Sequence, residues 1–209
     1  MCNLYRMTKG TAEVARLFAV EQGAPANFAA EVYPGTPGLV VTGGRTAAMV
    51  WGFPLVLKGK QGQPLRPKPV TNAREDKLLT SFWRDSFVSR RCLIPVSQWA
   101  EAEGAKGAMT RTWYGLPGAE LFAVAGLWQA SAEWGQVYSM VMVDGHEQMA
   151  DVHDRMPLVL DAPGQAAWLG GSADAALKLC EVWPGELTVE RTAQRWAGEP
   201  TPPPQATLF

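Results

Sequence analysis

The sequence predicts an α+β fold: a single domain with a mixed, mainly antiparallel and partly barrel-like β core and short helices at its periphery. Many short apolar stretches have the composition of strands, and helical patterns lie between them at irregular intervals. The chain lacks the regular strand–helix–strand rhythm that would indicate a parallel α/β sheet. A length of 209 residues is enough for one well-buried domain.

The first quarter of the chain predicts a helix and a hairpin. Thr11–Val20 places apolar residues at helical spacing behind Thr11, which would cap the helix. Gly38–Thr42 and Ala47–Phe53 have the composition of strands, and Gly43-Gly44 between them is typical of a tight hairpin turn.

The middle and the end of the chain predict a loop, a longer helix and further strands. Lys58–Pro69 is rich in Lys, Gly, Gln and Pro and is expected to be a loop. Asn72–Phe87 is expected to be helical after its first residues, with an apolar face. Further strands are expected over Arg91–Pro95, Arg111–Tyr114, Phe122–Trp128, Val137–Val143, Leu158–Leu160 and Leu187–Val189, and short helices over Ala162–Leu169 and Ala173–Val182.

Composition indicates a cytoplasmic globular protein. The chain is 47% hydrophobic and 19% charged, and no apolar run approaches the roughly 20 residues that span a bilayer. The start has no basic segment followed by an apolar one, so no secretory signal is expected. Three cysteines without C-x-x-C spacing and two histidines argue against a disulfide framework or a structural zinc site. We expect no metal, no cofactor and a monomer.

A net charge of −1 gives no bulk attraction to nucleic acid, so any DNA binding must come from a local cluster of Arg and Lys.

Cys2 directly follows the initiator methionine, in a context from which that methionine is normally trimmed. Trimming would leave an α-amine and a thiol on adjacent carbons. The amine can condense with an aldehyde, and the sulfur can then close a five-membered thiazolidine ring. The reference pKa is roughly 7.7–8.0 for the amine and about 8.5 for the thiol, so both reactive forms exist near neutrality. The alternative is an exposed residue on a frayed terminus.

Four short segments gather polar groups next to expected strands. They are Met1-Cys2-Asn3-Leu4-Tyr5, Thr71-Asn72-Ala73-Arg74-Glu75, Arg91-Cys92-Leu93-Ile94-Pro95 continuing to Glu101, and His153-Asp154-Arg155-Met156-Pro157. In this order the segments resemble the SRAP family, the SOS-response-associated peptidase domain, whose members crosslink to abasic sites in single-stranded DNA. The resemblance covers about four fifths of the chain and implies an SRAP-like domain over residues 1–197.

The resemblance implies four catalytic residues. Cys2 would trap the ring-opened abasic aldehyde, and Glu101 would relay protons if burial raises its pKa. His153 would donate a proton to the sugar ring oxygen. Asn72 would hold the sugar and the Cys2 amine. The alternatives are a surface glutamate in a loop, a structural histidine and a helix N-cap asparagine. The second histidine, His146, matches no family segment and is taken as structural.

The resemblance also implies DNA-binding residues. Arg74 and Arg155 match arginines that grip phosphates in the family, and an arginine fork suits phosphate oxygens; surface salt bridges are the alternative. Trp51 would help form a floor on which a flanking base stacks, and a core tryptophan is equally expected.

The tail from Gly198 onward is too rich in proline to pack and is expected to be flexible. It ends in Gln205-Ala206-Thr207-Leu208-Phe209, which resembles the pentapeptide by which bacterial repair proteins dock on the sliding clamp. Gln205 would anchor, while Leu208 and Phe209 would fill a groove. The alternative is a plain solvated tail.

Three functions follow from these observations. The leading hypothesis is a nucleoid-associated DNA-damage protein that crosslinks through Cys2 to abasic sites in single-stranded DNA and so shields the lesion. The second is a thiol peptidase or amidohydrolase with Cys2 as its N-terminal nucleophile. The third is a non-catalytic adaptor that reaches the clamp through its tail and binds DNA by charge alone.

Overall fold

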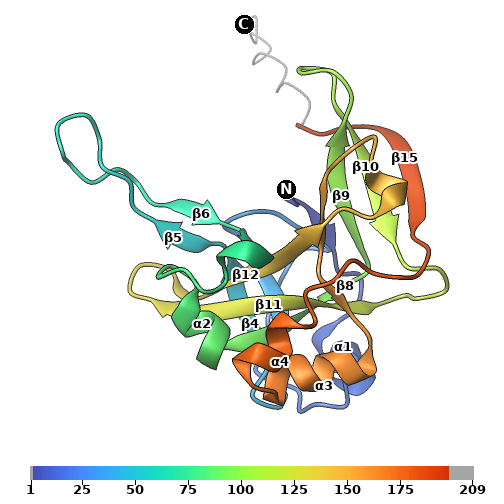
Figure 1. Ribbon diagram of the computed structural model, residues 1–209, viewed down its shortest axis with the longest axis horizontal. Coiled ribbons are helices and arrows are strands. Elements are labelled where there is room, and N and C mark those ends of the chain that lie inside the picture. The colour runs from blue at the N-terminus through green and yellow to red at the C-terminus, as the bar shows by residue number, and fades with distance from the viewer. Residues whose placement is uncertain (1, 198–209) are drawn as a thin grey trace, which may run out of the picture.

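The computed structural model describes residues 2–197, and its centre is a small β-barrel (Figure 1). Within these residues five strands close on themselves in the order β12-β4-β3-β8-β11-β12. Only the contact between β12 and β4 in this ring is parallel. The mixed, mainly antiparallel and partly barrel-like core expected from the sequence is therefore confirmed. The strands are β3 (Pro37–Thr42), β4 (Arg45–Trp51), β8 (Arg91–Val96), β11 (Phe122–Ser131) and β12 (Gly135–Asp144).

A second sheet packs beside the barrel in the order β15-β10-β9-β1-β2. The chain passes from β8 in the barrel to β9 in this sheet across the single residue Ser97. The hydroxyls of Tyr5 in β1 and Tyr138 in β12 hydrogen-bond at 2.5 Å in the buried space between the two sheets. The strands of this sheet are β1 (Tyr5–Arg6), β2 (Glu31–Val32), β9 (Gln98–Glu103), β10 (Thr110–Gly115) and β15 (Thr188–Arg195).

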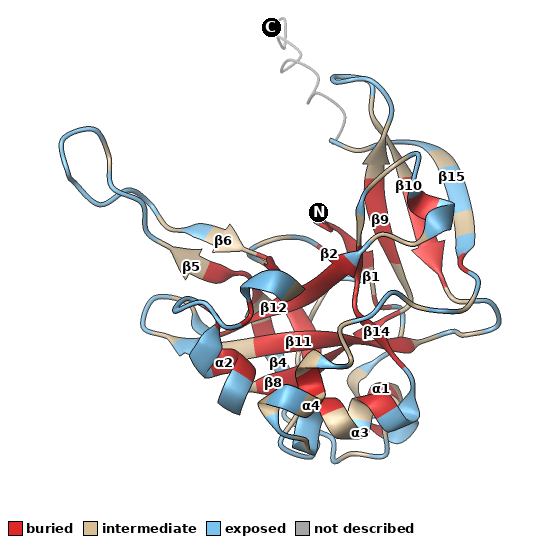
Figure 2. Cartoon of the chain, viewed as in Figure 1, coloured by how far each residue is buried: buried red, intermediate tan, exposed pale blue. Residues whose placement is uncertain are grey.

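The remaining elements surround this core. The hairpin of β5 (Phe53–Leu55) and β6 (Lys68–Val70) projects away from the barrel, and Figure 2 shows its outer loop exposed. Helices gather at the opposite end of the molecule in Figure 1. These elements are α1 (Thr11–Leu17), α2 (Arg84–Ser89), α3 (Ala162–Gly170), α4 (Ala173–Leu177), the 3₁₀ turns η1 (Glu75–Lys77) and η2 (Glu147–Met149), and the short strands β7 (Asn72–Arg74), β13 (Arg155–Pro157) and β14 (Val159–Leu160).

Glycines shape the first hairpin as expected. Gly43 and Gly44 have φ of 57° and 74° and join β3 to β4, which confirms the predicted two-residue turn. The second predicted strand, Ala47–Phe53, is instead interrupted at Gly52, where φ is 121°. An added Cβ at Gly52 would lie 2.4 Å from the Cβ of Pro69, so the chain can turn into β5 here only with glycine.

The helix predicted over Asn72–Phe87 is wrong. Asn72–Arg74 forms β7, which pairs in parallel with β12, and α2 begins only at Arg84. Leu79 and Phe82, two of the apolar residues of this segment, are 57% and 38% exposed. Pairing with a buried barrel strand outweighs the local helical pattern.

Other boundaries differ by a few residues. Gly10 and not Thr11 is the N-cap of α1, and no side chain bonds the cap. Helix α4 ends at Leu177 instead of Val182, whereas β15 continues to Arg195, well beyond Val189. Most of the segment predicted as a loop, Lys58–Pro69, lies outside regular elements, and its last residues begin β6. The other predicted strands and helix α3 are confirmed with small shifts.

Arg91 ties two helices to the barrel. Arg91 is 9% exposed, and its guanidinium donates to the carbonyl oxygens of Phe87, Trp168 and Gly171, which lie at the C-terminal ends of α2 and α3. These carbonyls carry the negative ends of the helix dipoles and accept from a cation favourably.

Among the described residues no helix has the length and apolar composition of a membrane span.

We expect Arg91→Met to lower the free energy of unfolding by about 2–4 kcal/mol, because several buried carbonyls lose a charged donor at once. Urea denaturation measures this change. Arg84→Met on the exposed side of α2 is the control and should change stability by less than about 0.5 kcal/mol. Equal stability of the two variants would contradict this role of Arg91.

Candidate functional site

The first residues of the described chain are held at the start of β7. Asn72 Nδ2 donates to the carbonyl oxygen of Cys2 at 2.8 Å and to Thr71 Oγ1 at 2.7 Å. Thr71 Oγ1 in turn donates to Asn3 Oδ1 at 3.2 Å. Asn72 therefore lies in a strand and positions Cys2, and the alternative of a helix N-cap is wrong.

Cys2 is buried and does not lie on an open surface. Its side chain is 0% exposed, and its Sγ donates to the carbonyl oxygen of Leu4 at 3.5 Å. Burial raises the pKa of the Cys2 thiol, and the negative charge of Glu101 raises it further. The thiol is thus held in its protonated form beside a carboxyl group, and the alternative of an exposed, frayed residue is wrong.

Glu101 belongs to β9, where it pairs with Thr112 of β10, and it is 2% exposed. Burial raises its pKa to about 7. The alternative of a surface glutamate in a loop is wrong. A carboxyl group with this pKa exchanges protons readily at neutral pH, which is what an acid–base residue requires.

His153 lies in the turn before β13. His153 Nδ1 lies 2.9 Å from the backbone nitrogen of Arg155 and 3.2 Å from the carbonyl oxygen of the same residue, so the tautomer of the ring decides whether Nδ1 accepts or donates there. Burial lowers the pKa of His153. Asp154 lies 3.4 Å from Nδ1, and its charge also raises the pKa of Glu101. Asp154 therefore connects the surroundings of the histidine with those of the glutamate.

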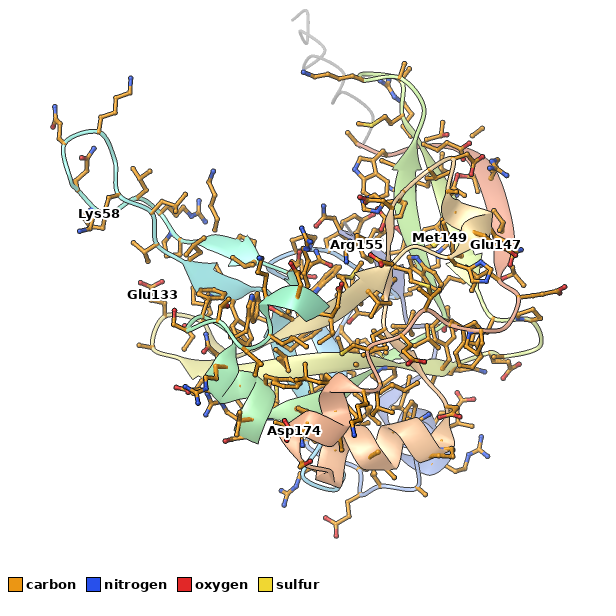
Figure 3. All side chains as sticks on the ribbon, viewed as in Figure 1. Lys58, Glu133, Glu147, Met149, Arg155 and Asp174 are labelled. Atoms are coloured by element: carbon orange, nitrogen blue, oxygen red, sulfur yellow. The ribbon has the colours of Figure 1, made fainter. Side chains whose placement is uncertain are left out.

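The two arginines flank one strand. Arg74 in β7 lies opposite Met142 on one edge of β12, and Arg155 in β13 lies opposite Asp144 on the other edge. Figure 3 shows Arg155 between the β5–β6 hairpin and the sheet that contains β9. Arg74 thus lies in the same strand as Asn72, and Arg155 lies on the other edge of β12.

Each arginine is paired with carboxylates. Arg155 Nη1 contacts Glu75 Oε1 at 2.7 Å and Asp144 Oδ1 at 3.1 Å, and Arg74 Nε contacts Asp76 Oδ1 at 3.0 Å. Both arginines therefore form salt bridges, which was the alternative to phosphate binding. Phosphate binding by these arginines stays a prediction.

Trp51 is a core residue. Its ring is 0% exposed, packs edge-on against Tyr5 at 5.1 Å between ring centroids, and donates from Nε1 to the Thr71 carbonyl oxygen. A base needs an accessible ring face for stacking, so the prediction that Trp51 helps form a stacking floor is wrong.

Sequence reasoning gave no role to Thr71 or Asp154, although both lie inside the quoted segments. Their contribution depends on the fold: Thr71 contacts Asn3 from the start of the chain, and the charge of Asp154 acts on Glu101. Within residues 2–197 no group of three or more His, Cys, Asp or Glu side chains is arranged to hold a metal ion.

The comparison with protein families decides what kind of domain this is. The family model described as SOS response associated peptidase (SRAP) matches residues 1–195. The chain belongs to the SRAP family.

Curated relatives of this SRAP chain carry a functional name. The abasic site processing proteins YoqW and YobE of Bacillus subtilis (strain 168) are 31% and 30% identical to it over 106 residues. These alignments cover 47% of this chain and 46% and 48% of the relatives, so the match spans about half the length of each.

Solved structures confirm the fold. A protein of Bordetella bronchiseptica superposes with a TM-score of 0.74 at 20% identity, covering 91% of this chain and 99% of the other. A protein of Bacteroides thetaiotaomicron gives a TM-score of 0.75 at 14% identity, with 91% of each chain covered.

Proposed function

We propose that this SRAP protein processes abasic sites in single-stranded DNA by forming a covalent crosslink through Cys2. The observation that carries the proposal is the environment of that residue. Asn72 holds the Cys2 carbonyl at 2.8 Å, and the charge of Glu101 acts on the Cys2 thiol. The names of the Bacillus relatives support the choice of an abasic site as the target.

The reaction needs a free α-amine on Cys2. Hydrolysis of the Met1–Cys2 peptide bond consumes one water and supplies that amine. The amine adds to the C1′ aldehyde of the ring-opened sugar, and loss of one water gives an imine. The thiol sulfur then bonds to the imine carbon, the thiol proton leaves through a base, and the imine nitrogen gains a proton. The product is a thiazolidine, and the condensation releases one water overall.

Glu101 and His153 would assist these proton transfers. Because the thiol is protonated, a base must take its proton as sulfur attacks, and a carboxyl group with a pKa of about 7 can accept that proton and return it to nitrogen. A ring N–H of His153 would donate a hydrogen bond to the sugar ring oxygen and favour ring opening. Asn72 would fix the amine through the adjacent carbonyl.

Arg74 and Arg155 would bind the phosphates on either side of the lesion. Arg74 is an exposed residue and its partner Asp76 is exposed as well, so their pair is weak and a phosphate can replace the carboxylate. Arg155 is held more firmly by Glu75 and would act as a fixed positive charge.

A second candidate keeps Cys2 as the nucleophile of a thiol peptidase or amidohydrolase, which the description of the family favours. The same cysteine, glutamate and histidine would serve it. Cys2-dependent cleavage of an added peptide would support this alternative.

Residues 198–209 lie outside the described residues. Docking of Gln205, Leu208 and Phe209 on a sliding clamp, the adaptor function that depends on it, association with the nucleoid and the monomeric state stay predictions.

Mass spectrometry tests the proposal directly. Incubation with a single-stranded oligonucleotide that carries one abasic site should give a heat-stable adduct. Its mass should equal the protein without Met1 plus the oligonucleotide minus one water. The same oligonucleotide with an intact base is the control and should give no adduct. Purified protein that retains Met1 and still forms the adduct would contradict the thiazolidine.

A further inference from the structure

A groove next to Asn72 extends beyond the residues that take part in the reaction described above. It encloses about 310 Å³ between the β5–β6 hairpin and the turn that precedes α2. Its apolar lining comes from Leu55, Val70, Phe82 and Trp83, and its polar lining from Asn72, Arg74, Lys77 and Thr80. One end of the groove therefore belongs to the candidate site.

The aromatic wall of the groove is fixed from behind. Trp83 is 6% exposed and packs against Phe53 at 4.9 Å between ring centroids. Phe82 packs edge-on against Trp83 at 4.7 Å and is itself 38% exposed. Phe82 thus offers part of a ring to a ligand while its neighbour holds it in place.

The chain segments next to the groove-lining residues expose further apolar side chains. Val56, Leu57 and Leu65, in the loop that joins β5 to β6, are 48%, 43% and 43% exposed, and Leu79, in the segment before α2, is 57% exposed. Exposed apolar side chains are typical of surfaces that bind ligands.

The charges at the groove point to an anionic ligand. Arg74 and Lys77 line it, and both pair with the single carboxylate of Asp76, at 3.0 Å and 3.3 Å. Two exposed cations share one exposed anion, so the cluster retains a positive charge, and its pairs are weak. A ligand with a flat apolar ring and an attached anion fits both parts of the groove.

We propose that this groove binds one nucleobase of the DNA strand next to the abasic sugar, with the base against Phe82 and its phosphate at Arg74 and Lys77. The proposal rests on the proposed function and names the second recognition element of the same site. A volume near the lower end of the usual range for small-molecule pockets suits a single base rather than a folded partner. Stacking on an aromatic ring tolerates any base, as a lesion-binding protein requires.

Binding without chemistry tests the groove separately from the crosslink. The probe is a single-stranded oligonucleotide with a tetrahydrofuran residue, which has no aldehyde, in place of the lesion. In a series, each neighbouring base is removed in turn by a further tetrahydrofuran spacer. We expect the wild-type protein to lose about tenfold in affinity when one particular neighbour is removed, and much less at the other positions.

Phe82→Ala should bind the fully based probe about tenfold more weakly and should be insensitive to removal of that neighbour. Phe82→Leu, which keeps apolar contact with Trp83 but lacks a ring, should behave similarly. Leu17→Ala, at an exposed apolar position on α1, is the control and should bind like wild type. Unchanged thermal melting of the Phe82 variants shows that they are folded.

Asp76→Asn should change the affinity for the probe in the opposite direction. Removal of the shared carboxylate frees Arg74 and Lys77, so the variant should bind the based probe several-fold more tightly, and the gain should shrink at high salt. If Phe82→Ala weakens every probe equally, or none, the groove does not hold a base. That result leaves adduct formation by wild-type protein unaffected, so failure of the groove and failure of the crosslink are distinguishable.

Discussion

Replacing Cys2 with alanine should abolish the heat-stable adduct while leaving a weaker, reducible one. Trimming of Met1 exposes an α-amine in the variant as well, so the aldehyde still forms an imine. No sulfur is available to close the ring, and the imine hydrolyses on heating. Borohydride added during incubation should therefore trap a Cys2→Ala adduct, whereas without borohydride no adduct of this variant should survive heating.

Cys180→Ala is the matched control, because Cys180 is a partly buried free cysteine in the part of the chain beyond the candidate site. It should form the heat-stable adduct at the wild-type rate. A Cys2→Ala protein that gives a heat-stable adduct without reductant would refute the thiazolidine. Loss of both kinds of adduct in that variant would indicate that the substitution has disrupted the whole site and has not merely removed the sulfur.

The candidate catalytic residues could be proposed from sequence because four short segments resemble the SRAP family in the same order along the chain. Cys2 stands out by position alone, and His153 is one of only two histidines. Their arrangement could not be foreseen, because it depends on pairing between distant segments. Asn72 meets Cys2 only because β7 joins the edge of β12, against a local pattern that favours a helix.

The strand that carries Glu101 also could not be predicted from local sequence. Gln98–Glu103 is rich in Ala and Glu, which have low strand propensity, and no strand was predicted there. It forms β9 because β1 and β10 pair with it on both sides. Burial in this sheet, which local sequence does not encode, also gives Glu101 its raised pKa.

The salt-bridge partners of the two arginines could not be predicted from sequence either. Their positions around β12 follow from the fold, but the partners that neutralise them do not follow from the motifs. Glu75 and Asp76 come directly after Arg74 in the sequence, yet Glu75 pairs with Arg155, 80 residues away in the chain. Trp51, for which a stacking floor and a core position were equally expected, lies in the core between Tyr5 and Tyr138.

Glu101→Gln should make the protein more stable above neutral pH and less active. Burial raises the pKa of Glu101 to about 7, whereas in the unfolded chain it has the ordinary value near 4.5. Between these two values the native state binds more protons than the unfolded state, so the free energy of unfolding falls as pH rises and levels off above about 7. Integrated from pH 5 to pH 8, this effect is about 2–3 kcal/mol in wild type and is absent in Glu101→Gln.

Urea unfolding at pH 5 and pH 8 measures the difference. Glu103→Gln is the matched control on the same strand, because hydrogen bonding from Thr112 lowers the pKa of Glu103, and its removal should not reproduce the gain at pH 8. The rate of adduct formation should rise with pH through about 7 in wild type, as the Glu101 carboxylate forms, and should be slow and flat in Glu101→Gln. A variant that gains stability at high pH yet crosslinks at the wild-type rate would mean that the buried carboxyl group is ionised without taking part in the reaction.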